Sequence, residues 1–590
     1  MVALPRFDDN PCPPRHFKPP PCAPLIPDGP TQRALDTARN RLVLTAALFV
    51  LLFAVVAGRA VQVMIFGRDA ASPRYTQFHV PAPPLPDRVD IVDRNGKILA
   101  TSLPIASLYA DPHQVLDPAG AVAKLLTVFP GLDRATLTKK LTSDKSFVWI
   151  RRRLTPRQEA AVNGLGIPGL QFDHEELRVY PYGDLLAHVV GYTGIDNHGF
   201  AGIERAYNTA LMKRHRPVQL SIDVRLQYIL RDEVAQVIKT FSAIGGGGII
   251  MNVNTGEVLA MVSLPDFDPN HPEKPDADYP DAKWADRTFN RMTLGDYEVG
   301  SVFKTFTMAM ALDCGAATMT SRFDAIHNIH VGRFTISDYH GKHRMLTLPE
   351  VYMYSSNLGA ARIALAVGAR RQEAYLRRFG LLTPPRIDLD ERGRPHYPTD
   401  WRPVNVMTIG FGHGISETPI QVAAAASAMI NGGILRPATL LKLAPGEVPK
   451  GRRVISPRTS KEMRQLLRLV VEYGTARFAK VPGYVVGGKT GTAEKVVHGV
   501  YARHKLLSDF IGAFPMNDPK YLIYMMVDEP HGTKATYGYA TAGWTVVPAT
   551  GRLIARIAPL LGIQPVDEKS PAIVDALTPK FMLGKKIEVY

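Results

Sequence analysis

The pattern of hydrophobic and polar positions contains one long apolar run near the N-terminus. Residues 42–58 carry no charged side chain, and beyond Arg59 the run continues to Phe66 with Gln62 as its polar exception. The uncharged part alone would form a helix about 25 Å long, the short end of what crosses a bilayer. Arg59 can extend its charge to the interface. The pattern predicts a transmembrane helix over residues 42–66.

The flanks of this run predict its orientation. Residues 1–41 are rich in Pro and lack hydrophobic periodicity, which predicts a disordered tail. Because three arginines precede the run, the positive-inside rule predicts a cytoplasmic tail and an exported body; they are Arg33, Arg39 and Arg41. A cleaved signal peptide is the alternative, but its charged leader would be unusually long. A buried core helix would lack a partner of similar hydrophobicity, so a signal anchor is favoured.

The next segment, residues 67–216, predicts a separate domain of short strands and amphipathic stretches. It opens with Pro81–Pro86, a proline-rich run typical of a stiff extended spacer. Two alternating runs around Asn95-Gly96, within residues 89–99, predict a β-hairpin. No catalytic constellation is found in this segment. The basic run at residues 213–216 marks the predicted domain boundary.

Residues 217–563 predict one large α+β unit. Val224–Ile238 has helical periodicity, the Ala-rich segment Ile420–Ile430 predicts a buried helix, and residues 248–262 predict a hairpin. Three more strands are predicted, at Val485–Lys489, Asp509–Phe514 and Tyr521–Val527. The polar, Pro-containing residues 564–590 predict a loose tail.

Composition narrows the function classes. With 590 residues and 46% hydrophobic content, the chain can build full-sized cores, which excludes wholesale disorder. Three cysteines (Cys12, Cys22 and Cys314) allow neither a disulfide framework nor a zinc pair. The net charge of +16 is scattered along the chain without an aromatic-basic motif. Nucleic-acid binding is therefore disfavoured.

The first candidate motif for chemistry is Ser301-x-x-Lys304, at the start of a predicted helix. Residues three apart lie on the same helical face, so the amine can approach the hydroxyl. A serine needs such a base at neutral pH, and a desolvated lysine can stay neutral and take its proton. Alone the motif is weak, because an ordinary helix start explains it equally well.

Two further motifs follow in the same unit. Ser355-x-Asn357 lies at a predicted helix start, where a hydroxyl can relay a proton and an amide can hold a carbonyl. Lys489-Thr490-Gly491-Thr492 ends a glycine-rich predicted strand, which could pair with an extended peptide. Its amine and hydroxyls suit a terminal carboxylate.

A competing interpretation of the last motif is a nucleotide-binding P-loop. Residues 483–490 match G-x-x-x-x-G-K-[ST] literally. That pattern requires a loop followed by a helix, whereas residues 484–486 have strand character and 491–499 are a poor helix. The segment also lies in the predicted exported part, so a P-loop is disfavoured.

Together the three motifs point to one family. The ordered set Ser-x-x-Lys, Ser-x-Asn and Lys-Thr-Gly is typical of penicillin-binding proteins and class A β-lactamases. Over residues 40–563 the chain resembles the penicillin-binding transpeptidases. The stretch before the catalytic domain is short for a glycosyltransferase domain, so class B is implied. The implied fold is α+β: a β-lactamase-like transpeptidase domain on an elongated non-catalytic pedestal, with one N-terminal transmembrane helix.

Other segments refine this resemblance. Residues 93–96, 178–183, 202–204 and Gly191 resemble the class B pedestal. Residues 412–416, with the nearby Thr418, Pro419 and Gln421, resemble the division-specific FtsI type. The elongation-specific class B type is the alternative.

The resemblance implies roles for eight residues, five of them catalytic and three substrate-binding. Ser301 would attack the penultimate D-Ala carbonyl of a D-Ala-D-Ala stem peptide, with Lys304 as base. Ser355 would pass a proton to the departing D-Ala, and Asn357 would orient the peptide. The carboxylate would be held by Lys489, Thr490, Gly491 and Thr492.

The resemblance also implies surroundings for this reaction. Neither a metal nor an organic cofactor is implied. The implied partners are peptidoglycan stem peptides, the lipid-linked precursor, β-lactams and an FtsW-type glycan polymerase. The implied location is the bacterial inner membrane, crossed once, with the catalytic domain in the periplasm.

Two other function classes compete. A β-lactamase or carboxypeptidase would hydrolyse the acyl-enzyme, but a class A β-lactamase needs a deacylating Glu, and Glu417 and Glu494 lie in the wrong context. A non-catalytic β-lactam sensor or division scaffold would retain the same motifs. A sensor would be expected to carry a signalling domain, and the N-terminal tail has none.

Overall fold

The computed structural model describes residues 29–66, 88–213, 216–274, 282–332, 334–497 and 499–589. The chain divides into two compact units between Ala82 and Pro83. The predicted spacer Pro81–Pro86 and residues 1–28 of the predicted tail lie outside the described residues.

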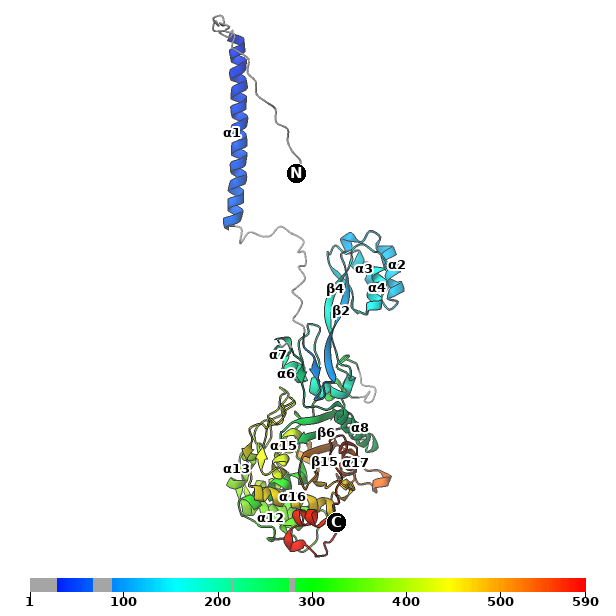
Figure 1. Cartoon of the computed structure of the whole chain (residues 1–590), viewed down its shortest axis with the longest axis vertical. Coiled ribbons are helices and arrows are strands. Elements are labelled where there is room, and N and C mark those ends of the chain that lie inside the picture. The colour runs from blue at the N-terminus through cyan, green and yellow to red at the C-terminus, as the bar shows by residue number, and fades with distance from the viewer. Residues whose placement is uncertain are drawn as a thin grey trace, which may run out of the picture. The chain divides into compact units, whose positions relative to one another are not determined.

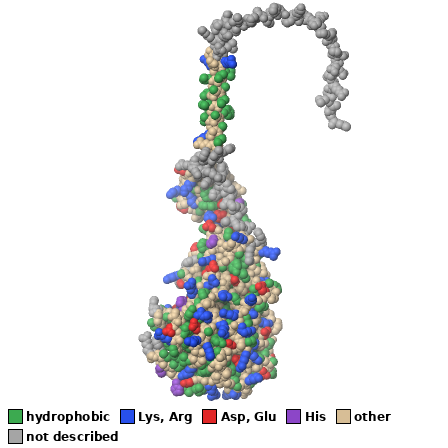
Figure 2. Space-filling model, turned by 90° about the vertical axis from the view of Figure 1, so that its left-hand side faces the viewer, with side chains coloured by type: hydrophobic (Ala, Val, Ile, Leu, Met, Phe, Trp, Pro, Cys, Tyr) green, Lys and Arg blue, Asp and Glu red, His purple; other side chains and the backbone are tan. Residues whose placement is uncertain are grey.

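The first unit contains a single described helix, α1 (Gly29–Phe66). Its segment Thr37–Gln62 is long and apolar enough to cross a membrane, which agrees with the predicted span. Figure 2 shows hydrophobic side chains covering this helix between basic side chains at its ends. The helix starts earlier than predicted. Pro30 suits a first turn, and the residues up to Arg41 include several good helix formers.

The second unit begins with a pedestal built on a long β-ribbon (Figure 1). The predicted hairpin is confirmed: β1 (Ile91–Val92) pairs antiparallel with β2 (Ile98–Ala110). Strand β2 pairs along its length with β4 (Leu170–Val179) and near its end with β3 (Val148–Leu154). A small head at this end contains α2 (Pro118–Val128), α3 (Arg134–Leu141) and α4 (Pro156–Asn163), with its own hydrophobic core.

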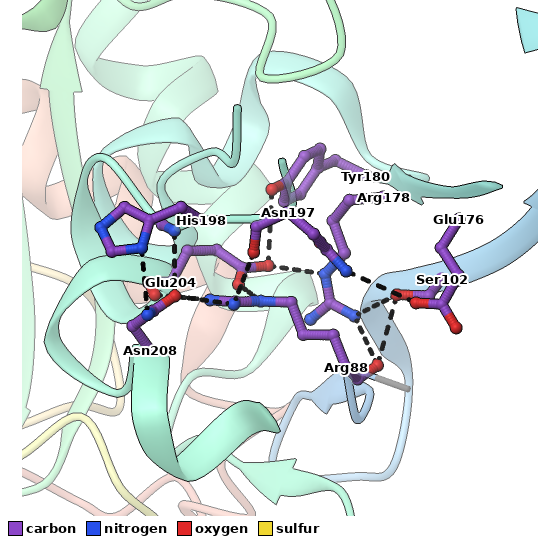
Figure 3. Close-up of polar contacts among 10 residues, drawn as sticks. Arg88, Ser102, Glu176, Arg178, Tyr180, Asn197, His198, Glu204 and Asn208 are labelled. Carbon is purple, nitrogen blue, oxygen red and sulfur yellow. Dashed lines mark hydrogen bonds and ion pairs between the residues drawn. The ribbon is translucent and has the colours of Figure 1, made fainter. Parts of the chain in front are cut away.

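A buried ion cluster holds the base of the pedestal (Figure 3). Arg88 Nε and Arg178 Nε contact the two carboxylate oxygens of Glu204 at 2.6 and 2.7 Å, and these side chains are at most 1% exposed. Arg88 also donates to Asn208 Oδ1 at 2.8 Å. Pairing of this kind offsets the cost of removing these charges from water. The cluster ties β4 to α6 (Gly202–Ala206).

The pedestal base and the main domain share one hydrophobic core. Strand β5 (Val218–Gln219) pairs parallel with β1. The buried Asp93 carboxylate accepts from Val224 N at 3.3 Å, at the start of α8 (Val224–Thr240). This joint makes the pedestal base continuous with the main domain.

The main domain is organised around a five-stranded antiparallel sheet in the order β14-β15-β16-β6-β7. Helices α8 and α17 cover one face, while α15 and α16 cover the other. The bounds are β6 (Gly245–Asn252), β7 (Val258–Leu264), β14 (Gly487–Val497), β15 (Val500–Phe514), β16 (Tyr521–Asp528), α15 (Pro419–Ile430), α16 (Pro457–Glu472) and α17 (Val546–Ile557). These elements confirm the predicted hairpin, the strands at Asp509–Phe514 and Tyr521–Val527, the buried helix and the α+β class. The strand predicted at Val485–Lys489 is wrong in its bounds: β14 begins at Gly487 and continues to Val497, because its pairing with β15 extends well past the glycines.

The remaining helices complete the main domain and the pedestal. Their bounds are α5 (Ala187–Val190), α7 (Asn208–Lys213), α9 (Trp284–Thr288), α10 (Lys304–Asp313), α11 (Leu348–Met353), α12 (Asn357–Val367), α13 (Ala369–Phe379) and α14 (Pro403–Gly410). Short strands pair locally as β8 (Arg322–Asp324) with β11 (Met345–Thr347), β9 (Ile329–Val331) with β10 (Phe334–Ile336), and β12 (Ile434–Leu435) with β13 (Arg452–Arg453).

The C-terminal segment differs from the loose tail that its polar sequence predicts. Residues Pro571–Leu577 form α18, and Leu577 and Met582 are buried in the main core. Glu588 reaches Lys342 Nζ at 2.7 Å. The segment is ordered because a few isolated apolar side chains pack into the core. Such widely spaced apolar residues do not form a hydrophobic period in the sequence, so they do not predict an element.

Candidate active site

The first motif lies at a turn that leads into a buried helix. Ser301 belongs to a short 3-10 turn, Gly300–Phe303, and Lys304 begins α10. Gly300 has φ +49°, and a Cβ placed there would lie 2.8 Å from Thr492 O. Glycine therefore lets the turn that carries Ser301 approach strand β14 closely.

The amine of Lys304 lies at the centre of the site. It donates to Ser355 O at 2.6 Å, Asn357 Oδ1 at 2.7 Å and Ser355 Oγ at 3.2 Å. Burial lowers its pKa to about 7, opposed by the charge of Asp338. The hydrogen bonds of this amine within the described chain do not include the Ser301 hydroxyl. The first two motifs therefore meet through Ser355 and Asn357.

The second motif occupies a strained junction between α11 and α12. Ser355 has φ +60°, a left-handed conformation that non-glycine residues rarely adopt. The next residue, Ser356, caps α12 by accepting from Gly359 N and donates to Asp338 Oδ2 at 2.6 Å. Asp338 also accepts from Leu358 N at 2.9 Å. The strain is held in place by the cap, which is typical of functional sites.

The third motif brings a second lysine to the same hydroxyl. Lys489 Nζ donates to Ser355 Oγ at 3.0 Å and to Thr490 O at 2.9 Å. Burial and the neighbouring Lys304 hold the pKa of Lys489 well below its usual range. Burial also raises the pKa of Asp509, on the adjacent strand β15. Ser355 Oγ thus lies between two buried amines.

Strand β14 presents its motif at the edge of the described sheet. A Cβ on Gly491 would lie 2.0 Å from Asp509 Oδ1 and 2.3 Å from Val299 O, so the strand packs tightly against both neighbours. The strand continues to Val497, where a P-loop would require a helix. The P-loop interpretation is thereby excluded.

One cleft of about 690 Å³ collects these groups. Its lining includes Ser301, Ser355, Asn357, Thr490 and Thr492. Lys304 and Lys489 are fully buried and reach it through Ser355. Gly491 lies between the two cleft-lining threonines. All eight predicted site residues therefore lie at or next to this cleft.

Within the described parts of the chain, no group of three His, Cys, Asp or Glu side chains could hold a metal ion.

Three supporting residues escaped the sequence analysis. Asp338 anchors α12 from a loop, Thr475 Oγ1 lies 2.7 Å from Thr490 Oγ1, and Asp509 is the cross-strand partner of Gly491 on β15. None belongs to a short motif. A signal exists only for Asp509, as the charged first residue of an otherwise apolar predicted strand.

The Gly412–Ser416 segment lies beside the site. The His413 ring packs between Phe411 and Tyr501, with centroids 5.3 and 5.6 Å away. Burial and the nearby Lys304 lower the pKa of His413 to about 4. The ring is therefore neutral at neutral pH, in keeping with a packing role.

Comparison with known families assigns both parts of the second unit. Residues 246–546 match the penicillin binding protein transpeptidase domain, and residues 83–214 match the penicillin-binding protein dimerisation domain. The chain therefore belongs to the penicillin-binding transpeptidase family and is a class B penicillin-binding protein.

Individual relatives agree with this assignment. The chain is 38% identical over 561 residues to a probable peptidoglycan D,D-transpeptidase FtsI of Caulobacter vibrioides, covering 93% of this chain and 92% of the relative. It is 30% identical over 522 residues to a probable peptidoglycan D,D-transpeptidase PenA of Neisseria meningitidis, covering 82% and 87%.

Solved structures show the same fold. Penicillin-binding protein 3 of Mycobacterium tuberculosis, complexed with aztreonam, aligns with a TM-score of 0.63 at 24% identity, covering 82% of this chain and 98% of that chain. The transpeptidase domain of Burkholderia pseudomallei penicillin-binding protein 3 aligns with a TM-score of 0.52 at 30% identity, covering 59% and 98%. Both predictions, the family and its fold, are confirmed.

Proposed function

We propose that this chain is a serine D,D-transpeptidase that crosslinks peptidoglycan stem peptides at the division septum. The convergence of two buried amines on Ser355 Oγ, in the cleft that Ser301 lines, carries this proposal. Family membership and the FtsI and PenA names of the relatives support the reaction class.

Acylation starts with proton removal from Ser301. A neutral Lys304 amine has two N–H bonds, and two of its neighbours, Ser355 O and Asn357 Oδ1, can only accept. These two contacts use both N–H bonds and leave the lone pair for a hydroxyl proton. Ser301 Oγ then bonds to the penultimate D-Ala carbonyl carbon. Hydrogen bonds of this kind often tighten only when substrate is bound.

Departure of the terminal D-Ala requires a proton on its nitrogen. Once Lys304 has taken the Ser301 proton, its ammonium has a third N–H for Ser355 Oγ, which also accepts from Lys489. The hydrogen of Ser355 is then free to be donated to the leaving amine. The C–N bond breaks as this proton arrives, and Lys304 resupplies Ser355. An amine of a neighbouring stem then bonds to the ester carbonyl carbon and gives a proton to the neutral Lys304. The C–O bond to Ser301 breaks and Lys304 returns the proton to Ser301 Oγ, which completes the crosslink and frees the serine.

Substrate binding falls to strand β14 and the nucleophile turn. The N–H groups of Ser301 and Thr492 form the oxyanion hole, and the close approach of Gly300 to Thr492 supports this pairing. Thr490, Gly491 and Thr492 hold the terminal carboxylate, with Lys489 supplying positive charge. Asn357 orients the peptide. A β-lactam would occupy the same place and acylate Ser301.

Labelling with a fluorescent penicillin tests the nucleophile. We expect covalent labelling of the full chain and complete loss of labelling in Ser301→Ala, because the variant lacks the attacking oxygen. Ser143→Ala, in the pedestal head, is the matched control and should label normally. Persistent labelling of Ser301→Ala would exclude Ser301 as the nucleophile. Rapid loss of the adduct would indicate a hydrolase, and a stable adduct without crosslinking activity would indicate a sensor or scaffold.

The cellular role is part of the same proposal. Arg39 and Arg41, at the N-terminal end of the candidate span, support a cytoplasmic N-terminus and a periplasmic cleft. An FtsW-type glycan polymerase is the proposed partner that delivers strands from the lipid-linked precursor. Depletion should produce filamentous cells, whereas rounded cells would indicate the elongation-specific type. Protease added to spheroplasts should digest the second unit and leave α1.

A further inference from the structure

The cleft contains one carboxylate whose role the reaction does not explain. Glu494, on β14, lines the cleft together with Ser301. Within the described parts of the chain, its carboxylate has no hydrogen-bond or ion-pair partner. The other acid in the lining, Asp338, is already bound to Ser356 and Leu358. Glu494 is therefore the carboxylate of the cleft that remains available to a ligand.

The strand determines where this carboxylate points. Thr490, Thr492 and Glu494 alternate along β14 and all line the cleft, as the two-residue period of a strand requires. The neighbouring Lys495 instead contacts Asp528 and Glu529 at 2.8 and 2.9 Å. Glu494 thus belongs to the row of side chains that includes the proposed carboxylate-binding threonines.

An apolar surface lies beside the carboxylate. Leu506 on β15 is the cross-strand partner of Glu494, and both line the cleft. Paired residues of adjacent strands project from the same face, so the leucine and the carboxylate are neighbours. An alkyl chain that ends in a cation matches this pair, because its methylenes can lie on Leu506 while its charge reaches Glu494.

The order along the strand identifies the substrate residue that meets this pair. With the terminal carboxylate at Thr490 and the penultimate D-Ala carbonyl in the proposed oxyanion hole at Thr492, the donor runs antiparallel to β14. Its earlier residues therefore extend toward Glu494. Two strand residues span about 7 Å. The residue before D-Ala-D-Ala therefore lies within side-chain reach of Glu494.

We propose that Glu494 and Leu506 form the subsite for the residue that precedes D-Ala-D-Ala in the donor stem, and that this subsite selects an alkyl side chain bearing a primary ammonium. The proposal rests on the proposed transpeptidase function and deepens it. It assigns Glu494 a role in specificity; Ser301 and the two lysines still perform the chemistry.

Two donor peptides test this subsite. Both end in D-Ala-D-Ala, and the preceding residue is either L-lysine or ε-N-acetyl-L-lysine; the full chain is used and D-Ala release gives kcat/KM. We expect the free amine to be preferred by about tenfold, the scale of one charge-assisted contact in a partly exposed site. The preference should decline at high salt, since exposed charges are screened. In Glu494→Gln the ratio should fall to about one, and in Glu494→Lys the acetylated peptide should be preferred.

Glu159→Gln, in the pedestal head, is the matched control and should keep the wild-type ratio. A wild-type ratio near one, or a ratio that survives in Glu494→Gln, would overturn the subsite. An effect of Glu494→Gln confined to the crosslinking step would also overturn it, because the carboxylate would then serve the acceptor. Failure of the proposed function is a different result: neither peptide would release D-Ala, and penicillin would not label Ser301.

Discussion

At the residue scale, the site depends on two lysine amines that share one serine hydroxyl. Ser355 Oγ lies 3.2 Å from Lys304 Nζ and 3.0 Å from Lys489 Nζ. Two ammonium groups so close together in a buried site would repel each other, and desolvation further disfavours both charges. The pKa of Lys304 is lowered to about 7, and that of Lys489 lies well below its usual range. A neutral amine is therefore accessible at neutral pH.

The lowered pKa of Lys304 predicts a pH profile for acylation. Only the neutral amine can take the Ser301 proton, so the second-order rate of penicillin acylation should rise with pH and level off above about pH 7. Well below that value the rate should change about tenfold per pH unit, because the neutral fraction does. Stopped-flow or quenched labelling between acidic and mildly alkaline pH measures this profile.

Circular dichroism at each pH is the control, since unfolding in acid would also slow labelling. Lys304→Ala should reduce acylation by roughly 100-fold or more, the scale for losing a positioned base. The residual acylation rate of this variant should no longer rise with pH near pH 7. A wild-type rate that is constant across pH 7, or falls there, would contradict Lys304 as the base.

At the element scale, strand β14 positions the proposed substrate-binding residues through close backbone packing. Gly491→Ala would place a Cβ 2.0 Å from Asp509 Oδ1 and 2.3 Å from Val299 O. The strand must shift to relieve these contacts, and small displacements of positioned groups cost large factors in rate. We expect acylation to fall by about 100-fold and stability by about 1–3 kcal/mol.

Gly131→Ala is the matched control, because a Cβ at Gly131 meets nothing within 4 Å. Its acylation rate and melting temperature should match those of the wild type. Normal acylation of Gly491→Ala would show that the strand does not position the reacting groups.

The cap of α12 positions the second motif. Ser356→Ala removes the hydroxyl that caps the helix and leaves Asp338 Oδ2 without its 2.6 Å donor. Loss of a helix cap costs about 1 kcal/mol. Because Ser355 and Asn357 flank the cap, acylation should also slow by about tenfold. Thermal unfolding and penicillin acylation measure the two effects.

Ser456→Ala provides the comparison, since Ser456 caps α16 by accepting from Thr459 N. It should lose similar stability with little change in acylation. Equal effects of the two variants on acylation would mean that the cap of α12 acts only through global stability.

At the scale of the whole second unit, a single carboxylate holds the pedestal base together. Glu204→Gln would leave Arg88 and Arg178 buried beside a neutral amide. Breaking a buried ion pair costs about 3–5 kcal/mol, because the remaining charges stay desolvated. We expect the melting temperature to fall by several degrees, measured by calorimetry.

The exposed pair Arg152–Glu175 supplies the control: Glu175→Gln should lower the free energy of unfolding by less than about 1 kcal/mol. Equal losses would indicate that the buried cluster is dispensable.

Much of this architecture can be predicted from the sequence, because the patterns that predict these elements are formed by residues close together in the chain. The apolar run of α1, the Asn95-Gly96 hairpin and the Ala-rich helix α15 have hydrophobic periods that depend on neighbouring residues alone. The C-terminal segment was mispredicted because its order depends on single anchors such as Leu577, which gain stability only by packing against distant residues.

For the three motifs too, some properties could be predicted from the sequence and others depend on the tertiary structure. The residues proposed to react were predicted from the sequence, since Ser301, Ser355 and Lys489 lie in short motifs whose order and composition are typical of the family. Their environment was decided by the tertiary structure: Lys304 turns to Ser355 and Asn357, Asp338 caps α12, and burial lowers the lysine pKa values. Desolvation and hydrogen bonding depend on groups brought together from remote parts of the chain, so a linear motif cannot specify them.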